Sequence, residues 1–279
     1  MAGRLTESLP MRYASSSDVL RRIEAGGLPH GREQSFKLAR GRLLPDRLLV
    51  GLPRGALDAP EIEAWAMQLG MPEGGWELLA GHLAAANAVF IGTEDGPTSC
   101  MLKMYLEFWD DVRQAVRNGA RTPQLLHLGV KWSTDRPARW EEARYLCHPL
   151  LSTRDILRRM AGCYAESTTT ASLEHARAVV QRAAQRAPGA SFLYLEVEEA
   201  GNPRRSYDIN LYKSGLRVRD AADNIRAIAS HLGVPGADVE GQLDELGERP
   251  LGHISGGTDR RGEEFLSVYA EIQPLPDDA

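Results

Sequence analysis

The chain has 279 residues, a formal net charge of −5, 43% hydrophobic residues and 25% charged residues, as is typical of a folded globular protein. This balance gives no basic surface for nucleic acid or an anionic membrane, and no apolar run reaches the roughly 20 residues of a membrane span. Three widely spaced cysteines without a CxxC pair, and an N-terminus without a signal-like apolar stretch, indicate a cytoplasmic protein with reduced thiols.

Five β-hairpins separated by helices are predicted along the chain. Turn signals such as Pro45-Asp46 bend the hairpins, which we expect at residues 35–52, 88–108, 125–148, 191–213 and 253–272. Capping residues begin several of the helices, which we expect at residues 17–24, from 58, at 75–86, 110–118, from 152, and at 173–186, 218–232 and 237–246. Because the strands come in tight adjacent pairs, we expect antiparallel pairing and not parallel βαβ units. No linker interrupts the chain, which predicts an N-terminal stretch over 1–34 and a single domain over 35–279.

The predicted strands alternate between polar and apolar residues. In the segment 101–108, Lys103, Tyr105 and Glu107 share one face, and apolar residues occupy the other. The polar faces of further strands carry His127 and Lys131, Tyr194 and Glu196, Asp208, Asn210 and Tyr212, His253, and Tyr269 and Glu271. Only four of the 33 basic residues are lysines, and all four lie in predicted strands, although the arginine bias is typical of a GC-rich bacterial genome. Lysines kept in strands call for an explanation.

The helices between the hairpins need an apolar surface, and the apolar strand faces are the available partners. Five consecutive hairpins with a similar polar face favour closure into a barrel, because closure removes the exposed edge strands. About ten strands would leave a lumen that can hold a ligand. The sequence therefore predicts an α+β fold in which helices surround a ten-stranded antiparallel barrel. An open α+β sheet whose polar face docks a partner remains the alternative.

A ring of helices around such a barrel, built from repeated ααββ units, resembles the ABBA aromatic prenyltransferases. The resemblance covers about residues 35–273 and is mainly architectural. Three short segments are similar to that family's lysine- and tyrosine-bearing strands, namely Lys103-Met104-Tyr105, Asn210-Leu211-Tyr212 and Val268-Tyr269. The resemblance implies transfer of a prenyl group from an allylic diphosphate to an aromatic or other nucleophilic acceptor inside the lumen.

Specific roles follow from this resemblance. Cations must surround the departing diphosphate, and the candidates are Lys103 and Lys131, helped by His127, Arg144 and His148. Tyrosine faces would shield the allylic cation from water, and the candidates are Tyr105, Tyr194, Tyr212 and Tyr269. Asn210 and His253 complete the predicted lumen. A carboxylate would remove the proton from the alkylated ring, and Glu94, Glu107 and Glu271 are the candidate bases.

Two features differ from the family pattern. The predicted lumen is acidic, with Glu107, Glu196, Asp208 and Glu271, and it contains few arginines. These acids could pair with the lysines as structural ion pairs, or could suit a cationic ligand such as an amine. A non-catalytic barrel that binds a small molecule or peptide is therefore the second alternative. The sequence also leaves open which face of residues 143–148 points inward.

Metal binding has little support in the sequence. The histidines have no spacing typical of a metal site, and Asp110-Asp111 is interpreted as a helix start. The glycine-rich segment 252–257 leads to another strand and is interpreted as a flexible hairpin. We therefore expect no resident cofactor, with magnesium as at most a weak assistant. The expected partners are a prenyl diphosphate and an aromatic or peptide acceptor, without nucleic acid or membrane.

Overall fold

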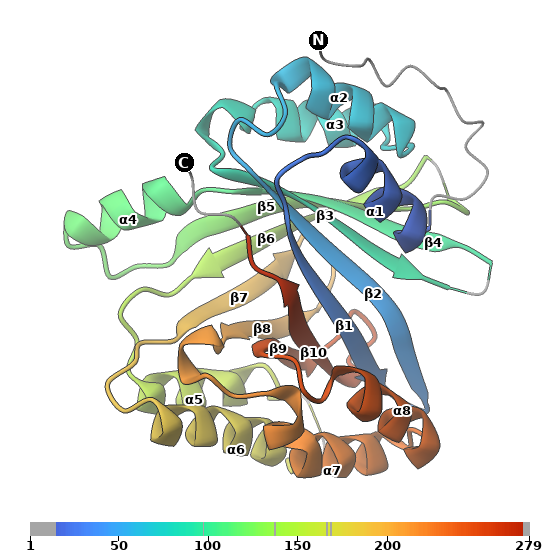
Figure 1. Cartoon of the computed structure of the whole chain (residues 1–279). Helices are drawn as coiled ribbons and strands as arrows, with labels where there is room; N and C mark the ends of the chain where they lie inside the picture. The colour runs from blue at the N-terminus through green and yellow to red at the C-terminus, as the bar shows by residue number, and fades with distance from the viewer. Residues whose placement is uncertain (1–14, 97, 137, 166, 168, 276–279) are drawn as a thin grey trace.

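The computed structural model describes residues 15–96, 98–136, 138–165, 167 and 169–275, and there ten strands close into one antiparallel barrel (Figure 1). Each strand pairs with its neighbours in the sequence, and the barrel closes where β1 pairs with β10. The strands are β1 (Gly31–Ala39), β2 (Arg42–Pro53), β3 (Ala88–Asp95), β4 (Cys100–Glu107), β5 (Gln124–Ser133), β6 (Trp140–Cys147), β7 (Leu193–Glu199), β8 (Arg205–Asn210), β9 (Leu251–Thr258) and β10 (Glu264–Gln273). The predicted barrel is confirmed, and the open-sheet alternative is wrong. The predictions for residues 1–14 and Pro97 lie outside the described residues.

Eight α-helices of the described residues surround the barrel (Figure 1). They are α1 (Ser16–Ala25), α2 (Ala59–Gln68), α3 (Glu73–Ala80), α4 (Trp109–Arg117), α5 (Thr153–Gly162), α6 (Ala171–Arg186), α7 (Ala222–Leu232) and α8 (Gly236–Leu246). Local chemistry explains where they begin. The Asp58 side chain accepts a hydrogen bond from the Glu61 backbone N–H and the Glu61 side chain bonds back, which forms a capping box at α2. The predicted helix starts at Asp58 and Ser152 are confirmed.

The first hairpin bends at a different place from the predicted one. The two strands meet at a tight turn over Arg40 and Gly41, where Gly41 has a φ of 68°. Pro45 and Asp46 lie inside β2, where the pairing with β1 shifts register, as expected of a β-bulge. Proline is tolerated at such bulges because no ladder hydrogen bond is required of it. The turn signal therefore marked a bulge.

The last two hairpins also differ from their predicted boundaries. Strand β8 ends at Asn210, so Tyr212 and Lys213 lie in a 3-10 turn, and Lys213 is exposed. Strand β9 continues through Gly256 and Gly257, so the predicted flexible hairpin is wrong. A Cβ atom on Gly256 would lie 2.6 Å from the Tyr207 hydroxyl oxygen. The glycine at this position allows a buried tyrosine to pack against the strand.

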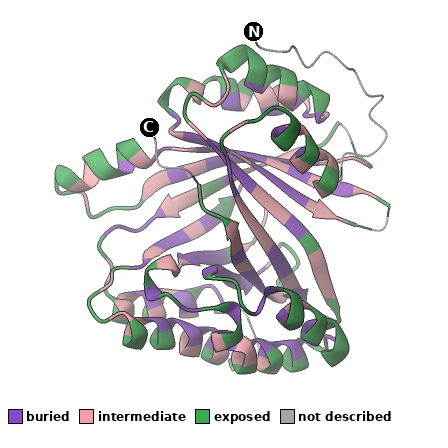
Figure 2. Cartoon of the chain, in the orientation of Figure 1, coloured by how far each residue is buried: buried purple, intermediate pink, exposed green. Residues whose placement is uncertain are grey.

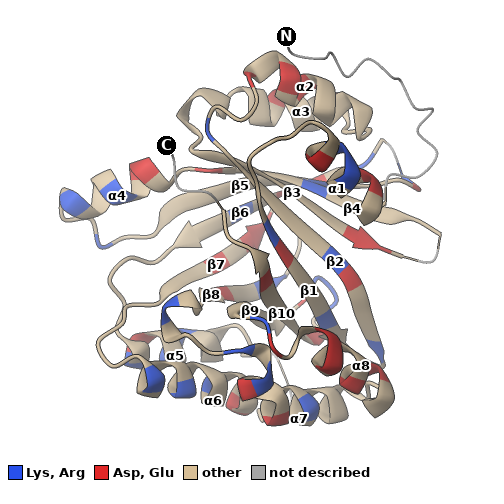
Figure 3. Cartoon of the chain, viewed as in Figure 1, with Lys and Arg blue, Asp and Glu red and all other residues tan. Residues whose placement is uncertain are grey.

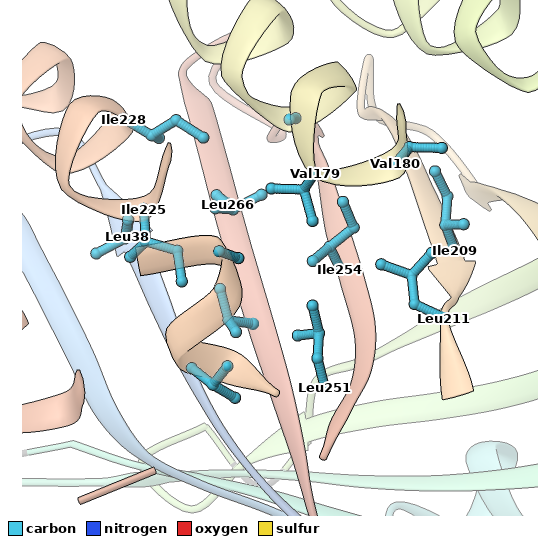
Figure 4. Close-up of a cluster of buried hydrophobic side chains, with 14 of the residues drawn as sticks. Leu38, Val179, Val180, Ile209, Leu211, Ile225, Ile228, Leu251, Ile254 and Leu266 are labelled. Carbon is cyan, nitrogen blue, oxygen red and sulfur yellow. The ribbon is translucent and has the colours of Figure 1, made fainter. Parts of the chain in front are cut away.

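Two large apolar clusters join seven of the helices to the outer face of the barrel, and a smaller one contains Val112 of α4. Helices α1–α3 cover β2–β5, and α5–α8 cover β1 and β7–β10. Figure 4 shows Val179 and Ile228 from the helices facing Ile254 and Leu266 from the strands. The helices are buried toward the barrel and exposed outward (Figure 2), where acidic and basic residues intermix (Figure 3). In the described part of the chain, no helix has both the length and the apolar character needed to cross a bilayer.

Candidate active site

The inner face of the barrel is polar because the strands alternate. On β4, Leu102 and Met104 are almost fully buried against helices, whereas Lys103 and Tyr105 line two adjoining cavities inside the barrel. The same alternation on neighbouring strands brings polar side chains from most of the barrel into one lumen. The residues shared by both cavities are Arg47, Lys103, Tyr105, Tyr145, Asp208 and Tyr269.

Cations gather at one end of this lumen, which we call the basic end. The six basic side chains there are Lys37, Arg47, Lys103, Lys131, Arg204 and Arg260. Glu94 accepts hydrogen bonds from Lys103 Nζ at 3.1 Å and from Arg47 Nε at 3.2 Å. Glu199 accepts from Lys131 Nζ and from Arg204 Nη1, each at 2.5 Å. Arg260 pairs with Glu141. Four carboxylates, those three and the shared Asp208, therefore face six basic groups, so the basic end retains a net positive charge.

The lysines of the basic end are destabilised in their charged form. Burial, followed by the nearby Arg47 charge, lowers the pKa of Lys37 to about 7. Burial, followed by the Arg204 charge, lowers the pKa of Lys131 to about 7, although Glu199 opposes this shift. The Nζ atom of Lys37 lies 4.2 Å from the ring centroid of Phe265. A bound anion would relieve this crowding of positive charge.

The middle of the lumen is aromatic. The rings of Tyr105 and Tyr145 meet edge to face at 5.5 Å, and the Arg47 guanidinium lies 5.6 Å from the Tyr269 ring centroid. Tyr105 requires Gly129 on the adjacent strand, since a Cβ atom there would lie 2.2 Å from the tyrosine ring. Burial raises the pKa of Tyr145 to about 12, so its hydroxyl stays neutral. Electron-rich ring faces therefore surround the region next to the cations.

Carboxylates and a histidine occupy the opposite end, which we call the acidic end. His253 lies between two acids, with Nδ1 2.8 Å from Asp208 Oδ1 and Nε2 3.4 Å from Glu33 Oε1. Tyr212 donates its hydroxyl hydrogen to Glu33, and its ring meets His253 edge to face. Burial would lower the pKa of His253, but Glu33 and Asp208 raise it well above its usual value. His253 therefore carries a positive charge at neutral pH.

Three further predicted residues have positions that do not match the roles expected of them. Burial lowers the pKa of His127 to about 3, so it is neutral, and its ring contacts Phe90 and Tyr145. Glu107 lies opposite His127 in the β4–β5 pairing, away from the basic end. Asn210 accepts a hydrogen bond from the Tyr212 backbone N–H and so shapes the 3-10 turn.

Four of the predicted residues lie outside the lumen, which corrects the expectation for them, and one is His148, whose ring contacts Tyr194 and Arg159. Arg144 is half-exposed on the outer face of β6 and pairs with Glu142, because Tyr145 is the residue of this strand that points inward. Tyr194 is fully buried beneath the helices with Tyr207. Glu196 faces outward and pairs with His148 and Arg159. On β7 the apolar Leu195 lines the cavity. Both faces of this strand are covered, so the polarity of its residues does not tell which face points into the lumen.

Sequence reasoning missed four of the six basic residues at the basic end, namely Lys37, Arg47, Arg204 and Arg260. Arg204 and Arg260 belong to arginine pairs near the hairpin turns, where charges are usually solvated, but both line the cavity at the basic end. Lys37 precedes and Arg47 follows Pro45-Asp46, where the turn was wrongly predicted. Neither residue was therefore assigned to the inner face of a strand. Lys37 was nevertheless one of four strand lysines, and that signal could have placed it. The expected shortage of arginines in the lumen is wrong.

Within the described ranges, no three histidine, cysteine, aspartate or glutamate side chains converge in a way that could hold a metal ion. At the acidic end, Glu33 and Asp208 each contact His253, so the histidine is occupied on both ring nitrogens. The cations at the basic end instead offer an anion a ready set of charge-assisted hydrogen bonds.

Solved structures share this architecture. The 5-dimethylallyl tryptophan synthase from Streptomyces coelicolor, in complex with DMASPP and Trp, aligns over 99% of this chain and 87% of its own, with 14% identity and a TM-score of 0.55. The NotF prenyltransferase aligns over 95% of this chain and 84% of its own, with 12% identity and a TM-score of 0.54. The prenyltransferase PriB aligns over 99% and 88%, with 16% identity and a TM-score of 0.53.

No protein-family model matches the sequence, and no curated protein matches it. The identities to the solved structures are low, so the likeness concerns the fold. The closed ten-stranded antiparallel barrel and its surrounding helices are the ABBA fold of aromatic prenyltransferases. The resemblance inferred from the alternating strands is therefore confirmed at the level of architecture.

Proposed function

We propose that this protein transfers an allylic prenyl group from a diphosphate to an aromatic acceptor inside the barrel. The observation that carries the proposal is the order of groups along the lumen, in which a net positive end adjoins an aromatic middle. Structures with the same fold support it, because one is complexed with DMASPP and Trp and NotF is complexed with brevianamide F and DMSPP.

In this proposal the basic end binds the diphosphate. Lys37, Arg47 and Lys103 bind the leaving group and stabilise the negative charge that develops as the allylic C–O bond breaks. Lys131 and Arg204 form ion pairs with Glu199, so they contribute to the positive electrostatic potential around the diphosphate without binding it directly. These cations already perform the neutralisation that a metal ion would provide, so we propose that transfer proceeds without one. Chelation with EDTA is then expected to leave turnover unchanged.

The aromatic middle then handles the allylic cation. Tyr105, Tyr145 and Tyr269 present ring faces that stabilise it and exclude water. A carbon of the acceptor ring attacks, a new C–C bond forms, and the ring proton leaves to a carboxylate. Glu94 is a weak proton acceptor, because Lys103 and Arg47 outweigh its burial and hold its pKa well below the usual value. Asp208 lines both cavities, and we propose it as the proton acceptor in place of Glu94.

Incubation with allylic diphosphates of increasing length and a panel of indoles and phenols tests the proposal, with prenylated product detected by mass spectrometry. Lys103→Met should lower turnover by about 100-fold, since removal of one group that stabilises transition-state charge costs roughly that factor. Lys213→Met is the matched control, because Lys213 is an exposed lysine on a 3-10 turn outside the lumen. Ligand binding without any product would instead identify a carrier barrel.

A further inference from the structure

Charge changes sign along the axis of the lumen. On the inner face of β1, Glu33 leads through Ser35 to Lys37, and on β4, Glu107 leads through Tyr105 to Lys103. Three successive antiparallel pairings make β1 and β4 run in opposite directions, so the direction from carboxylate to lysine is the same on both strands. Glu107 pairs with His127 on β5, and His127 lines the same cavity as Glu33 and His253, whereas Lys37 lines the cavity of the basic end. The lumen therefore has an axial charge gradient with aromatic rings between its two ends.

The acidic end has more negative charge than its own cation can balance. Glu33 and Glu271 are direct cross-strand partners in the β1–β10 pairing, an arrangement in which like charges repel. Burial and the Glu33 charge raise the pKa of Glu271, which reflects this repulsion. His253 is the only charged partner of Glu33 among the described residues, and it is shared with Asp208. Three carboxylates therefore share one positive charge.

One carboxylate oxygen at this end lacks a partner. Glu33 Oε1 accepts a hydrogen bond from Tyr212, but Glu33 Oε2 is buried and has no hydrogen-bond partner among the described residues. The Glu33 side chain lines the same cavity as Tyr105, Tyr145 and Tyr269. A buried carboxylate oxygen without a donor is costly, so this position favours a ligand that brings its own donor.

We infer that the acceptor is an aromatic ring that carries a protonated amine and no carboxylate beside it. This inference rests on the proposed function, because only a transferase has an acceptor. The preference for binding a protonated amine depends on the acidic end alone. The ammonium group would lie between Glu33 and Glu271 and donate to Glu33 Oε2, while the ring would lie among the tyrosines. A free arylalkylamine and the N-terminal aromatic residue of a peptide share this chemistry.

The gradient also explains what the site would reject. A carboxylate next to the amine would face Glu33, Asp208 and Glu271 and gain only His253, which those acids already use. Like-charge juxtaposition is a general source of specificity. The opposite ends of the lumen would then orient both substrates, with the diphosphate at the basic end and the ammonium at the acidic end.

Calorimetric titration tests the preference with probes that share an aromatic ring and differ in the charge at the end of the side chain. Tryptamine, 3-ethylindole and indole-3-propionate share a ring and carry charges of +1, 0 and −1, and tyramine with 4-ethylphenol repeats the comparison on a phenol. Each amine should bind at least about tenfold more tightly than its neutral analogue, as expected for a charge-assisted hydrogen bond. Tryptophanamide should bind more tightly than tryptophan by a similar factor. A peptide amide with an N-terminal tryptophan is titrated beside tryptamine. Tighter binding of the peptide indicates a peptide ligand, and tighter binding of tryptamine indicates a free amine.

Variants then place the ammonium site. Glu33→Gln and Glu271→Gln should each weaken tryptamine binding by about tenfold and leave 3-ethylindole binding unchanged. Glu63→Gln, an exposed residue of α2, is the matched control and should change neither. If Glu33→Gln fails to fold, the effect of Glu271→Gln on tryptamine binding still decides whether the ammonium group lies at the acidic end.

The outcomes separate this inference from the proposed function. Equal affinity for tryptamine and 3-ethylindole, together with equal affinity for tyramine and 4-ethylphenol, overturns the inference even if both are prenylated. Loss of affinity for both members of a pair in the glutamine variants overturns it too. A preference for the amines that depends on Glu33 and Glu271, without prenylated product from any acceptor, supports the ammonium site and refutes the transferase.

Discussion

At the scale of single residues, the lumen is controlled by charges that burial makes costly. Lys37 and Lys131 have pKa values lowered to about 7 by burial first and by neighbouring arginines second. Each lysine therefore gives up part of its charge at neutral pH when the site is empty. An anion at the basic end would restore that charge, so its binding should be coupled to proton uptake.

This coupling predicts a pH dependence for pyrophosphate binding. Below pH 7 the free lysines are already protonated, and above pH 7 each must take up a proton when the anion binds. Affinity should therefore fall as pH rises from 7 to 9, by up to about tenfold per pH unit for each lysine. Calorimetry of the wild type and of Lys37→Met measures the two slopes, and the ionisation of pyrophosphate cancels in their difference. Identical slopes would contradict the prediction.

The repulsion between Glu33 and Glu271 predicts a stabilising substitution. Burial and the Glu33 charge raise the folded-state pKa of Glu271, so its ionised form destabilises the fold at neutral and high pH. Glu271→Gln should raise the melting temperature at pH 8, and the gain should vanish as pH falls through the carboxyl range and Glu271 becomes protonated. Thermal melts of both proteins between pH 4 and 8 provide the comparison. A gain that persists unchanged at pH 4 would mean that charge is not the cause.

At the scale of elements, close contacts across neighbouring strands position the aromatic side chains. Gly129 on β5 leaves room for the Tyr105 ring on β4, and Gly256 on β9 leaves room for the Tyr207 ring on β8. The first contact lies inside the lumen and the second lies beneath the helices. A missing Cβ on one strand thus decides where the adjacent strand can place a tyrosine.

Gly129→Ala tests this arrangement. The added Cβ would lie 2.2 Å from Tyr105, so the ring must move out of the aromatic middle. We expect prenyl transfer to fall by about 100-fold, the loss typical of a misplaced reacting geometry. Gly162→Ala is the matched control, because its Cβ would meet nothing within 4 Å at the end of α5, where alanine should stabilise the helix slightly. Equal activity of the two variants would show that Tyr105 does not position the substrates.

At the scale of the whole molecule, closure of the barrel creates the site. The basic end draws Lys37 from β1 and Phe265 from β10, which meet only because the first and last strands pair. The acidic end depends on the same seam, where Glu33 and Glu271 lie opposite each other. Strands separated by more than two hundred residues thus form both ends of the lumen.

Opening this seam should abolish the folded state. Deletion of residues 264–279 removes β10, which leaves β1 and β9 as long unpaired edges next to an apolar core. We expect the shortened chain to lose its cooperative thermal transition and to associate, as measured by circular dichroism and size-exclusion chromatography. Addition of a peptide spanning 264–273 should restore part of the transition by pairing with both edges. A monomeric shortened chain that melts cooperatively would refute the role of closure.

Local patterns were sufficient for the architecture. The alternation around Lys103, the caps at Asp58 and Ser152, and the hairpin spacing depend on neighbouring residues alone, so the sequence predicts the barrel and most element boundaries. The errors arise where one signal has two physical uses. Pro45-Asp46 satisfies a bulge as well as a turn, and Tyr194 is as compatible with a buried outer face as with a lumen.

The sequence by itself determined which residue types alternate along each strand, because side-chain direction has a period of two in any β-strand. Only the tertiary structure decided which strands share a level of the barrel, and therefore which charges become neighbours. Arg204 and Arg260 enter the lumen because their hairpin ends converge at its basic end, and Glu33 meets Glu271 because the barrel closes. Charge balance depends on distances across the barrel, and register and closure set those distances.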